Sequence, residues 1–150
     1  MKAVIQRVSS ACVKINNQAV SNIKKGLVVL LGISDSDTQH DIDAMVDKIK
    51  NLRVFQDAEG KMNISVKDIG GEILIVSQFT LLADLEKGRR PSFIGAAQPQ
   101  KAEDIYGQVI DLLKKDGLKV ESGRFREYMQ VEIINDGPVT LIYDTNKKNT

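Results

Sequence analysis

Residues 27–33 read LVVLLGI, a run that is apolar at every position. A strand with one face in water alternates apolar and polar residues, and this run does not. A short continuous apolar run is typical of a buried strand. EILIVSQ at residues 72–78 follows the turn signal Gly70–Gly71 and has the same character. The sequence therefore predicts two buried strands.

Shorter strand patterns lie on either side of these two runs, and they are rich in β-branched residues or alternate in polarity. They are Val4–Val8, Ala11–Ile15, Arg53–Gln56, Tyr128–Ile134 and Val139–Tyr143. Asn16–Asn17 predicts a tight turn, and NDGP at residues 135–138 interrupts the last pattern. The final six residues, TNKKNT, predict a frayed terminus.

Two segments carry apolar residues at helical spacing. The first stripe is Ile42, Met45, Val46, Ile49 and Leu52, and the second is Ala102, Ile105, Val109, Leu112 and Leu113. N-cap candidates at residues 34–38 precede the first helix, Pro99 can open the second, and Gly117 can cap it. We therefore expect residues 1–150 to form a single α+β domain. Its core would be a mostly antiparallel, barrel-like β-sheet with two main amphipathic helices packed on it.

The composition narrows the class of protein. A net charge of +1 argues against a protein that tracks many phosphates along a nucleic acid. Cys12 is the only cysteine, which excludes an intramolecular disulfide and a cysteine-based zinc site. The start MKAVIQRVSS lacks the apolar segment of a signal peptide, and Leu27–Leu31 is too short to span a bilayer. We expect a soluble cytoplasmic protein with no metal site and no cofactor.

Elimination removes the commonest catalytic systems. His40 is the only histidine, so a Ser-His-Asp or Cys-His system would need it as the base. Its position near a helix start, beside Asp41 and Asp43, favours a solvated surface residue. Cys12 lies in a strand pattern, which favours a small buried side chain over a reactive thiol.

Two segments are candidates for chemistry. In SQFTL, residues 77–81, a buried strand ends in hydroxyl, amide, aromatic and hydroxyl side chains. The backbone N–H groups there could stabilise an oxyanion, although on the pattern alone an ordinary strand end is favoured. In DGPVT, residues 136–140, a plain turn is favoured, since only about 5–6% of X–Pro bonds are cis. A cis bond would reorient the neighbouring carbonyl groups.

EKGRRP at residues 86–91 places Lys87, Arg89 and Arg90 beside a glycine. Most charged runs are solvated surface, and that interpretation is favoured here. The alternative is a phosphate contact, for which the planar guanidinium of arginine is well suited.

Taken together and in order, these segments closely resemble the D-aminoacyl-tRNA deacylase family. The resemblance rests on MKAVIQRV from residue 1, SQFTLLAD from residue 77, KGRRPSF from residue 87 and NDGPVTLIYD from residue 135. It covers essentially the whole chain.

The resemblance implies an esterase that releases D-amino acids from D-aminoacyl-tRNA and also accepts mischarged glycyl-tRNA. It implies a homodimer with two active sites at the subunit interface, each binding the 3′-terminal adenosine end of the tRNA. Ser77, Gln78, Phe79 and Thr80 would form the catalytic segment of one subunit. A Gly-cisPro element, Gly137 and Pro138, would come from the other subunit and reject L-amino acids. Arg7 is expected to hold that element, and Met129 is expected to lie near the pocket.

The chain departs from the family pattern at one place. Many relatives have a Gly-Ala pair after the phenylalanine that corresponds to Phe125, whereas this chain has Arg126 and Glu127. The difference puts in question the shape and charge of this loop and its contact with the tRNA end. Two alternative functions are a dimeric nucleic-acid-binding module without esterase activity and a purely structural dimerisation domain. The charge balance and the lack of an aromatic stacking platform disfavour the first, and the polar SQFT segment disfavours the second.

Overall fold

The computed structural model describes residues 1–147. The last three residues of the predicted frayed tail, 148–150, lie outside this range. The start of the tail is ordered: the backbone N–H of Thr145 donates to the carbonyl oxygen of Met1 at 3.0 Å. Chain start and tail therefore lie against each other, and the prediction of fraying is wrong at Thr145.

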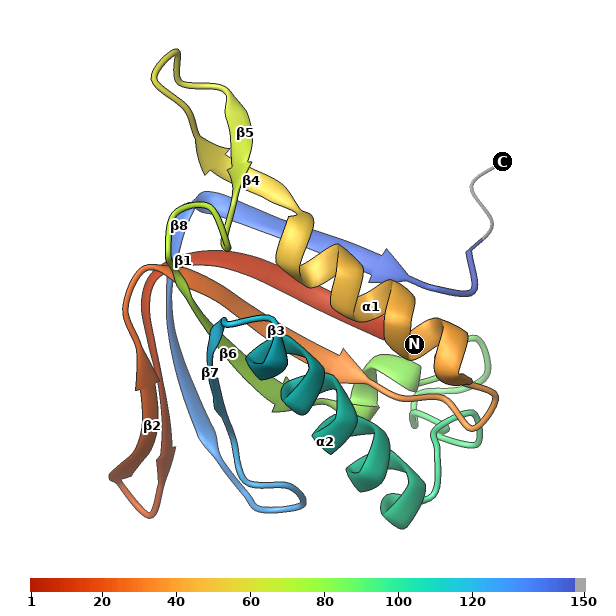
Figure 1. Cartoon of the computed structure of the whole chain (residues 1–150). Coiled ribbons are helices and arrows are strands. Elements are labelled where there is room, and N and C mark those ends of the chain that lie inside the picture. Colours follow the sequence, from red (N-terminus) through yellow and green to blue (C-terminus); the bar gives the residue numbers. More distant parts are fainter. Residues whose placement is uncertain (148–150) are drawn as a thin grey trace.

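Two long helices and eight strands follow one another in the described residues 1–147 (Figure 1). The strands are β1 (Lys2–Ile15), β2 (Gln18–Ile23), β3 (Gly26–Gly32), β4 (Arg53–Gln56), β5 (Met62–Ser65), β6 (Glu72–Ser77), β7 (Lys119–Ser122) and β8 (Gln130–Asp144). The helices are α1 (Gln39–Asn51), α2 (Pro99–Lys115) and a short 3-10 turn, η1 (Phe79–Leu82). The α+β class predicted from the sequence is confirmed. The predicted turn at Asn16–Asn17 is also present, with both residues at positive φ.

The long strand β1 organises the main sheet. One edge of β1 pairs with β8, and the other pairs with β3 along its first half and with β2 along its second half. These pairings are antiparallel, whereas β3 pairs with β6 and β6 with β7 in parallel. The sheet is therefore mixed, a detail that the strand patterns did not predict. β4 and β5 form a separate antiparallel pair.

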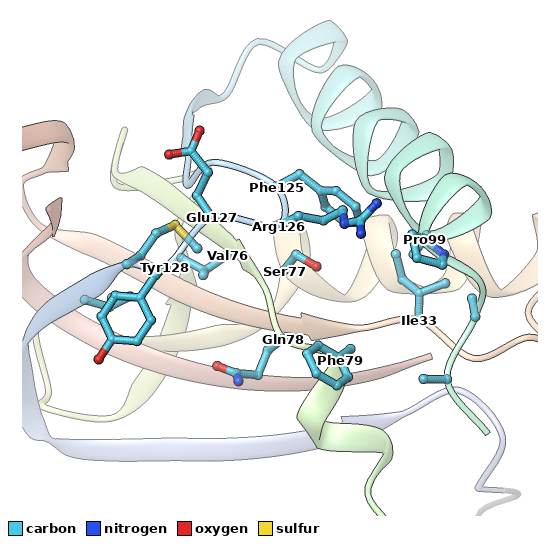
Figure 2. A pocket seen from close by; sticks show the side chains of 15 residues that line it. Ile33, Val76, Ser77, Gln78, Phe79, Pro99, Phe125, Arg126, Glu127 and Tyr128 are labelled. Carbon is cyan, nitrogen blue, oxygen red and sulfur yellow. The ribbon is translucent and has the colours of Figure 1, made fainter. Parts of the chain in front are cut away.

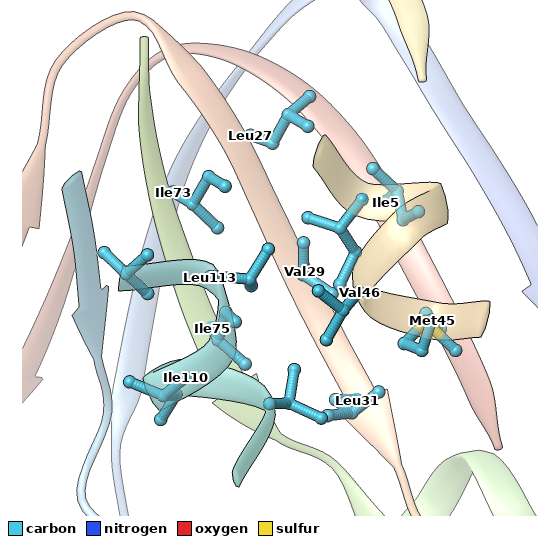
Figure 3. Close-up of a cluster of buried hydrophobic side chains, with 14 of the residues drawn as sticks. Ile5, Leu27, Val29, Leu31, Met45, Val46, Ile73, Ile75, Ile110 and Leu113 are labelled. Carbon is cyan, nitrogen blue, oxygen red and sulfur yellow. The ribbon is translucent and has the colours of Figure 1, made fainter. Parts of the chain in front are cut away.

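Burial on both faces explains the continuous apolar runs of β3 and β6. Leu27, Val29 and Leu31 point into the larger core, which α1 and α2 cover (Figure 3). Val28 lies in a second cluster on the opposite face, where β1, β2 and the first half of β8 close over the sheet. Successive side chains of a strand point to opposite faces, so both sets of positions must be apolar.

Both helices start as their sequences predict, and α2 also ends as predicted. Thr38 precedes α1, and its backbone N–H donates to Asp41 Oδ2 at 2.9 Å. Pro99 is the first residue of α2, and Gly117 follows its end at φ +83°. No helix within residues 1–147 is both long and apolar enough to cross a membrane.

Some local expectations need correction. The two predicted N-terminal strands form the single strand β1, and the two C-terminal ones form β8. NDGP therefore does not separate two strands. Cys12 is half-buried, because it faces away from the side on which Ala11 and Val13 are buried. His40 is exposed near the start of α1, as expected.

Candidate active site

The polar segment SQFTL begins where β6 ends. Ser77 is the last residue of β6, and the backbone N–H of Gln78 makes a final hydrogen bond of 2.8 Å to the carbonyl oxygen of Leu31. The chain then turns into η1, where Leu81 N–H donates to Gln78 O at 3.1 Å. The first N–H groups of a helical turn have no acceptor within it, so those of Phe79 and Thr80 are available to a ligand.

A pocket of about 550 Å³ opens beside this strand end (Figure 2). Its walls are mostly apolar and come from β6, the residues before and at the start of α2, and the loop between β7 and β8. The lining residues are Ile33, Val76, Ser77, Gln78, Phe79, Ala96, Ala97, Pro99, Ala102, Phe125, Arg126, Glu127, Tyr128, Met129 and Val131. Its volume is in the usual range for small-molecule sites in proteins.

Packing holds the aromatic walls of the pocket. Phe79 is half-exposed and meets Phe93 edge-on, with the ring centroids 5.0 Å apart. The ring centroids of Phe125 and Tyr106 are 5.9 Å apart. The hydroxyl of Tyr106 donates a hydrogen bond of 2.8 Å to the carbonyl oxygen of Ile75. Burial raises the pKa of Tyr106 to about 12. The phenol is protonated at neutral pH, so its hydroxyl keeps this hydrogen bond and holds the ring against which Phe125, a pocket residue, packs.

The loop between β7 and β8 carries the polar groups of the opposite wall. Arg126 has φ +65°, in the left-handed region that disfavours residues with a Cβ atom. Such a conformation costs about 1–2 kcal/mol for a residue other than glycine. Met129 fixes the end of the loop, since its sulfur accepts the backbone N–H of Arg124 at 3.2 Å.

The Gly137–Pro138 element is an exposed bulge in β8. Asn135 pairs with Val8 and Thr140 with Gln6, so four residues of β8 lie opposite Arg7 alone. The Gly137–Pro138 peptide bond is cis, and Gly137 has φ +130°. A Cβ atom on Gly137 would lie 2.8 Å from Arg7 Nη2, so the position requires glycine.

Two side chains fix this bulge. Arg7 is buried and donates from Nε to Asp136 O at 3.0 Å and from Nη1 to Val54 O at 2.7 Å. Asn135 closes the base: its Oδ1 accepts the Val139 N–H at 2.9 Å, and its Nδ2 donates to Thr140 Oγ1 at 2.8 Å. The tip of the bulge is thus held from within the molecule and projects into solvent.

The predicted site residues fall into two separate places within one chain. Ser77, Gln78, Phe79 and Met129 line the pocket, and Thr80 follows Phe79 in the same exposed turn. The second group, Arg7, Gly137 and Pro138, is not among the pocket residues and lies around the β8 bulge.

Comparison with known proteins identifies the family. The D-Tyr-tRNA(Tyr) deacylase family matches residues 4–144. The chain belongs to this D-aminoacyl-tRNA deacylase family. It is 54% identical to the D-aminoacyl-tRNA deacylase of Natranaerobius thermophilus, over 99% of both chains. It is 50% identical to that of Thermotoga petrophila, over 98% of this chain and 99% of the relative.

Two solved structures share the fold of this chain. A structure titled "c-Myc DNA Unwinding Element Binding Protein" superimposes with a TM-score of 0.92 at 46% identity and covers 98% of this chain and 100% of that one. A second, described as a probable eukaryotic D-amino acid tRNA deacylase, has a TM-score of 0.80 at 18% identity and covers 95% and 97%. The second likeness shows that the deacylase fold is shared.

Sequence reasoning missed several residues that shape the site. Ala97 is attached to the end of β3 by its N–H, which donates to Ile33 O at 2.9 Å, and the only local signal was the run of small residues before α2. Gly32 lies directly beneath η1: a Cβ atom there would approach Leu82 Cδ2 to 2.4 Å and Gln78 O to 3.1 Å. Neither contact is visible in the sequence, because each joins segments more than forty residues apart.

We predict that Gly32→Ala displaces η1 from the end of β3. The added methyl group overlaps Leu82, and such overpacking costs about 1–3 kcal/mol of the free energy of unfolding. Urea denaturation measures the loss, and backbone amide chemical shifts should change around residues 78–82 but not in α1. Gly95→Ala is the matched control, since nothing lies within 4 Å of its Cβ position. Unchanged shifts in η1 would contradict the packing role of Gly32.

Proposed function

We propose that this protein hydrolyses the ester bond of D-aminoacyl-tRNA and releases the free D-amino acid and tRNA. The observation that carries the proposal is the pocket at the end of β6, walled by Ser77, Gln78 and Phe79, in a chain 54% identical to a D-aminoacyl-tRNA deacylase. The partner would be aminoacyl-tRNA in the cytoplasm, and the reaction needs neither metal nor cofactor.

The pocket suits the 3′-terminal adenosine. The rings of Phe79 and Phe125 and the small side chains of Ala96 and Ala97 offer apolar surface to a base. Stacking of a base on an aromatic side chain contributes about 1–3 kcal/mol. With the base held there, the ribose and its ester would lie toward the free N–H groups of η1. Binding at one end of the tRNA also fits a net charge of only +1.

Ester hydrolysis requires an oxygen nucleophile and stabilisation of the oxyanion that forms on the ester carbonyl. Thr80 Oγ1 accepts a hydrogen bond of 2.5 Å from the Gln78 side-chain amide, which cannot act as a base. We therefore assign oxyanion stabilisation to the backbone N–H groups of Phe79 and Thr80. The neighbouring 2′-hydroxyl of the tRNA would take part in the attack, and positioning supplies much of the rate.

The active site would be completed by a second copy of the chain. Within residues 1–147, β8 pairs only with β1, and its outward face exposes Ile142, which is 79% accessible. A groove of about 240 Å³ joins Ile142 to Val4 and to Leu81 of η1 at one end of the β1–β8 pair. The Gly137–Pro138 bulge lies further along the same pair, opposite Arg7.

A twofold axis between these two places would bring the bulge of each protomer to η1 of the other. Such packing buries the exposed apolar edge and unites the two groups of predicted residues. We therefore propose a homodimer with one active site at each end of its interface.

Selectivity would come from rejection of one enantiomer. If the carbonyl groups of Gly137 and Pro138 bind the substrate amino group, the α-carbon has one permitted handedness. The side chain of an L-amino acid would then clash with the bulge. The side chain of a D-amino acid would point to solvent, so the protein would not discriminate between different D-amino acids. Since Arg7 and Asn135 hold the bulge, it cannot move aside easily. Glycine has no side chain to clash, so glycyl-tRNA would be hydrolysed as well.

One observation favours a second candidate, a nucleic-acid-binding module. The similar solved structure at 46% identity is titled as a DNA-unwinding-element binding protein. The near-neutral charge disfavours broad phosphate contact. A DNA-binding assay over a range of salt concentrations separates the two functions. Tight DNA binding at physiological salt by a variant without esterase activity would favour the nucleic-acid-binding module.

Incubation with D- and L-tyrosyl-tRNA tests the activity and its selectivity together. We expect release of D-tyrosine at least ten-thousandfold faster than L-tyrosine, which requires about 5.5 kcal/mol of discrimination. Release is followed with radiolabelled amino acid. Equal rates for both enantiomers would refute the selectivity proposal, and no release of either would refute the activity.

Thr80→Ala and Thr80→Val test the role assigned to the backbone. Both variants keep the N–H groups of η1, so kcat should stay within about threefold of wild type. Loss of an oxyanion donor would lower it by about 10²–10³. Single-turnover hydrolysis of D-tyrosyl-tRNA measures the rate, and thermal unfolding checks the fold. Complete loss of activity in two normally folded variants would instead make Thr80 the nucleophile.

Mixed dimers test whether the site is shared. Phe79→Ala and Pro138→Ala should each weaken both sites of a homodimer at least tenfold, because stacking or the amine contact is lost. A heterodimer of the two variants, purified through two different tags, keeps one intact site and should recover about half of the wild-type activity. If each site lay within one chain, the heterodimer would be as weak as the homodimers.

A further inference from the structure

Arg126 is the positively charged side chain among the residues that line the pocket. Its backbone has φ +65°, which places an arginine where the chain geometry favours glycine or asparagine. Figure 2 shows its guanidinium turned toward Phe125 and Pro99, whereas the carboxylate of Glu127 extends in the opposite direction. Strained residues of this kind cluster at ligand sites, where the gain from binding offsets their cost.

No ion pair in the described part of the chain neutralises the charge of Arg126. None of the ion pairs within residues 1–147 includes Arg126. The positive end of α2, beginning at Pro99, borders the same pocket. The side chain is exposed, so its guanidinium reaches the pocket opening rather than the buried floor. An anionic group entering with the ligand would find its counter-charge at this position.

We propose that Arg126 binds the phosphate on the 5′ side of the terminal nucleoside of the substrate. This inference rests on the proposed function, since the nucleoside occupies the pocket only if aminoacyl-tRNA is the substrate. The base fills the apolar part of the pocket, the ester meets η1, and the next group along the tRNA is a phosphodiester. Guanidinium groups bind phosphate through two parallel hydrogen bonds.

The contact predicts a particular kinetic signature. Arg126 and the η1 turn belong to different walls of the pocket, so Arg126 touches the phosphate and not the reacting ester. The contact between Arg126 and the phosphate therefore stabilises the bound substrate and the transition state by the same free energy. Removal of such uniform binding raises KM and leaves kcat unchanged.

Two small esters isolate the phosphate: D-tyrosine on the ribose of adenosine, and D-tyrosine on the ribose of adenosine 5′-phosphate. The wild-type protein should have a KM roughly tenfold lower for the phosphate-bearing ester, the factor expected of a charge-assisted hydrogen bond. Arg126→Gly should abolish this difference without lowering kcat, and Arg126→Lys should restore part of it. Glycine suits φ +65°, so Arg126→Gly should fold normally.

Arg124→Ala is the matched control. Arg124 is an exposed arginine in the same loop that does not line the pocket, and its substitution removes the same charge. It should keep the wild-type preference. A preference that persists in Arg126→Gly, or that is absent in the wild type while both esters are hydrolysed, would overturn the phosphate contact and leave the proposed function standing. If the wild type hydrolysed neither ester nor D-tyrosyl-tRNA, the proposed function itself would fall.

Discussion

Burial of β3 and β6 on both faces is the constraint on which the rest of the structure depends. α1 and α2 cover one face of this parallel pair, and β1, β2 and β8 close over the other. Parallel strands are stable mainly where both faces are covered, because each exposed face would leave apolar side chains in water. The sheet must therefore curl around the parallel pair. The ends of β3 and β6 then lie beside the start of α2 and the loop before it.

The candidate site follows from the way in which β6 leaves the sheet. After Ser77 the chain cannot continue the ladder, since η1 turns across Gly32 at the end of β3. Free backbone N–H groups are thereby placed at the edge of a pocket whose walls are otherwise apolar. The fold thus supplies positioned backbone donors, and this suits the hydrolysis of an already activated ester.

The bulge in β8 depends on buried polar contacts. Arg7 carries its charge below the β8 bulge, where carbonyl groups of Asp136 and Val54 accept its hydrogen bonds. A buried guanidinium without acceptors would be costly, so the contacts that satisfy Arg7 also fix the bulge. The bulge is therefore rigid but remote from the pocket of its own chain. This rigidity and this separation from the pocket are what the proposed dimer requires, since in that proposal the bulge serves the site of the partner subunit.

The sequence by itself determined the α+β class, the presence of both helices and the two ends of α2, because apolar periodicity, Pro99 and Gly117 are local signals. The SQFTL and NDGP motifs likewise marked the strand end and the bulge on which the proposed site depends. Tertiary structure alone decided the parallel pairing of β3 with β6, the continuity of β8 through its bulge, and the place of Gly32 beneath η1. It also placed Arg126 at the opening of the pocket. These features depend on contacts between distant segments, and residue patterns report which face is buried but not which neighbour buries it.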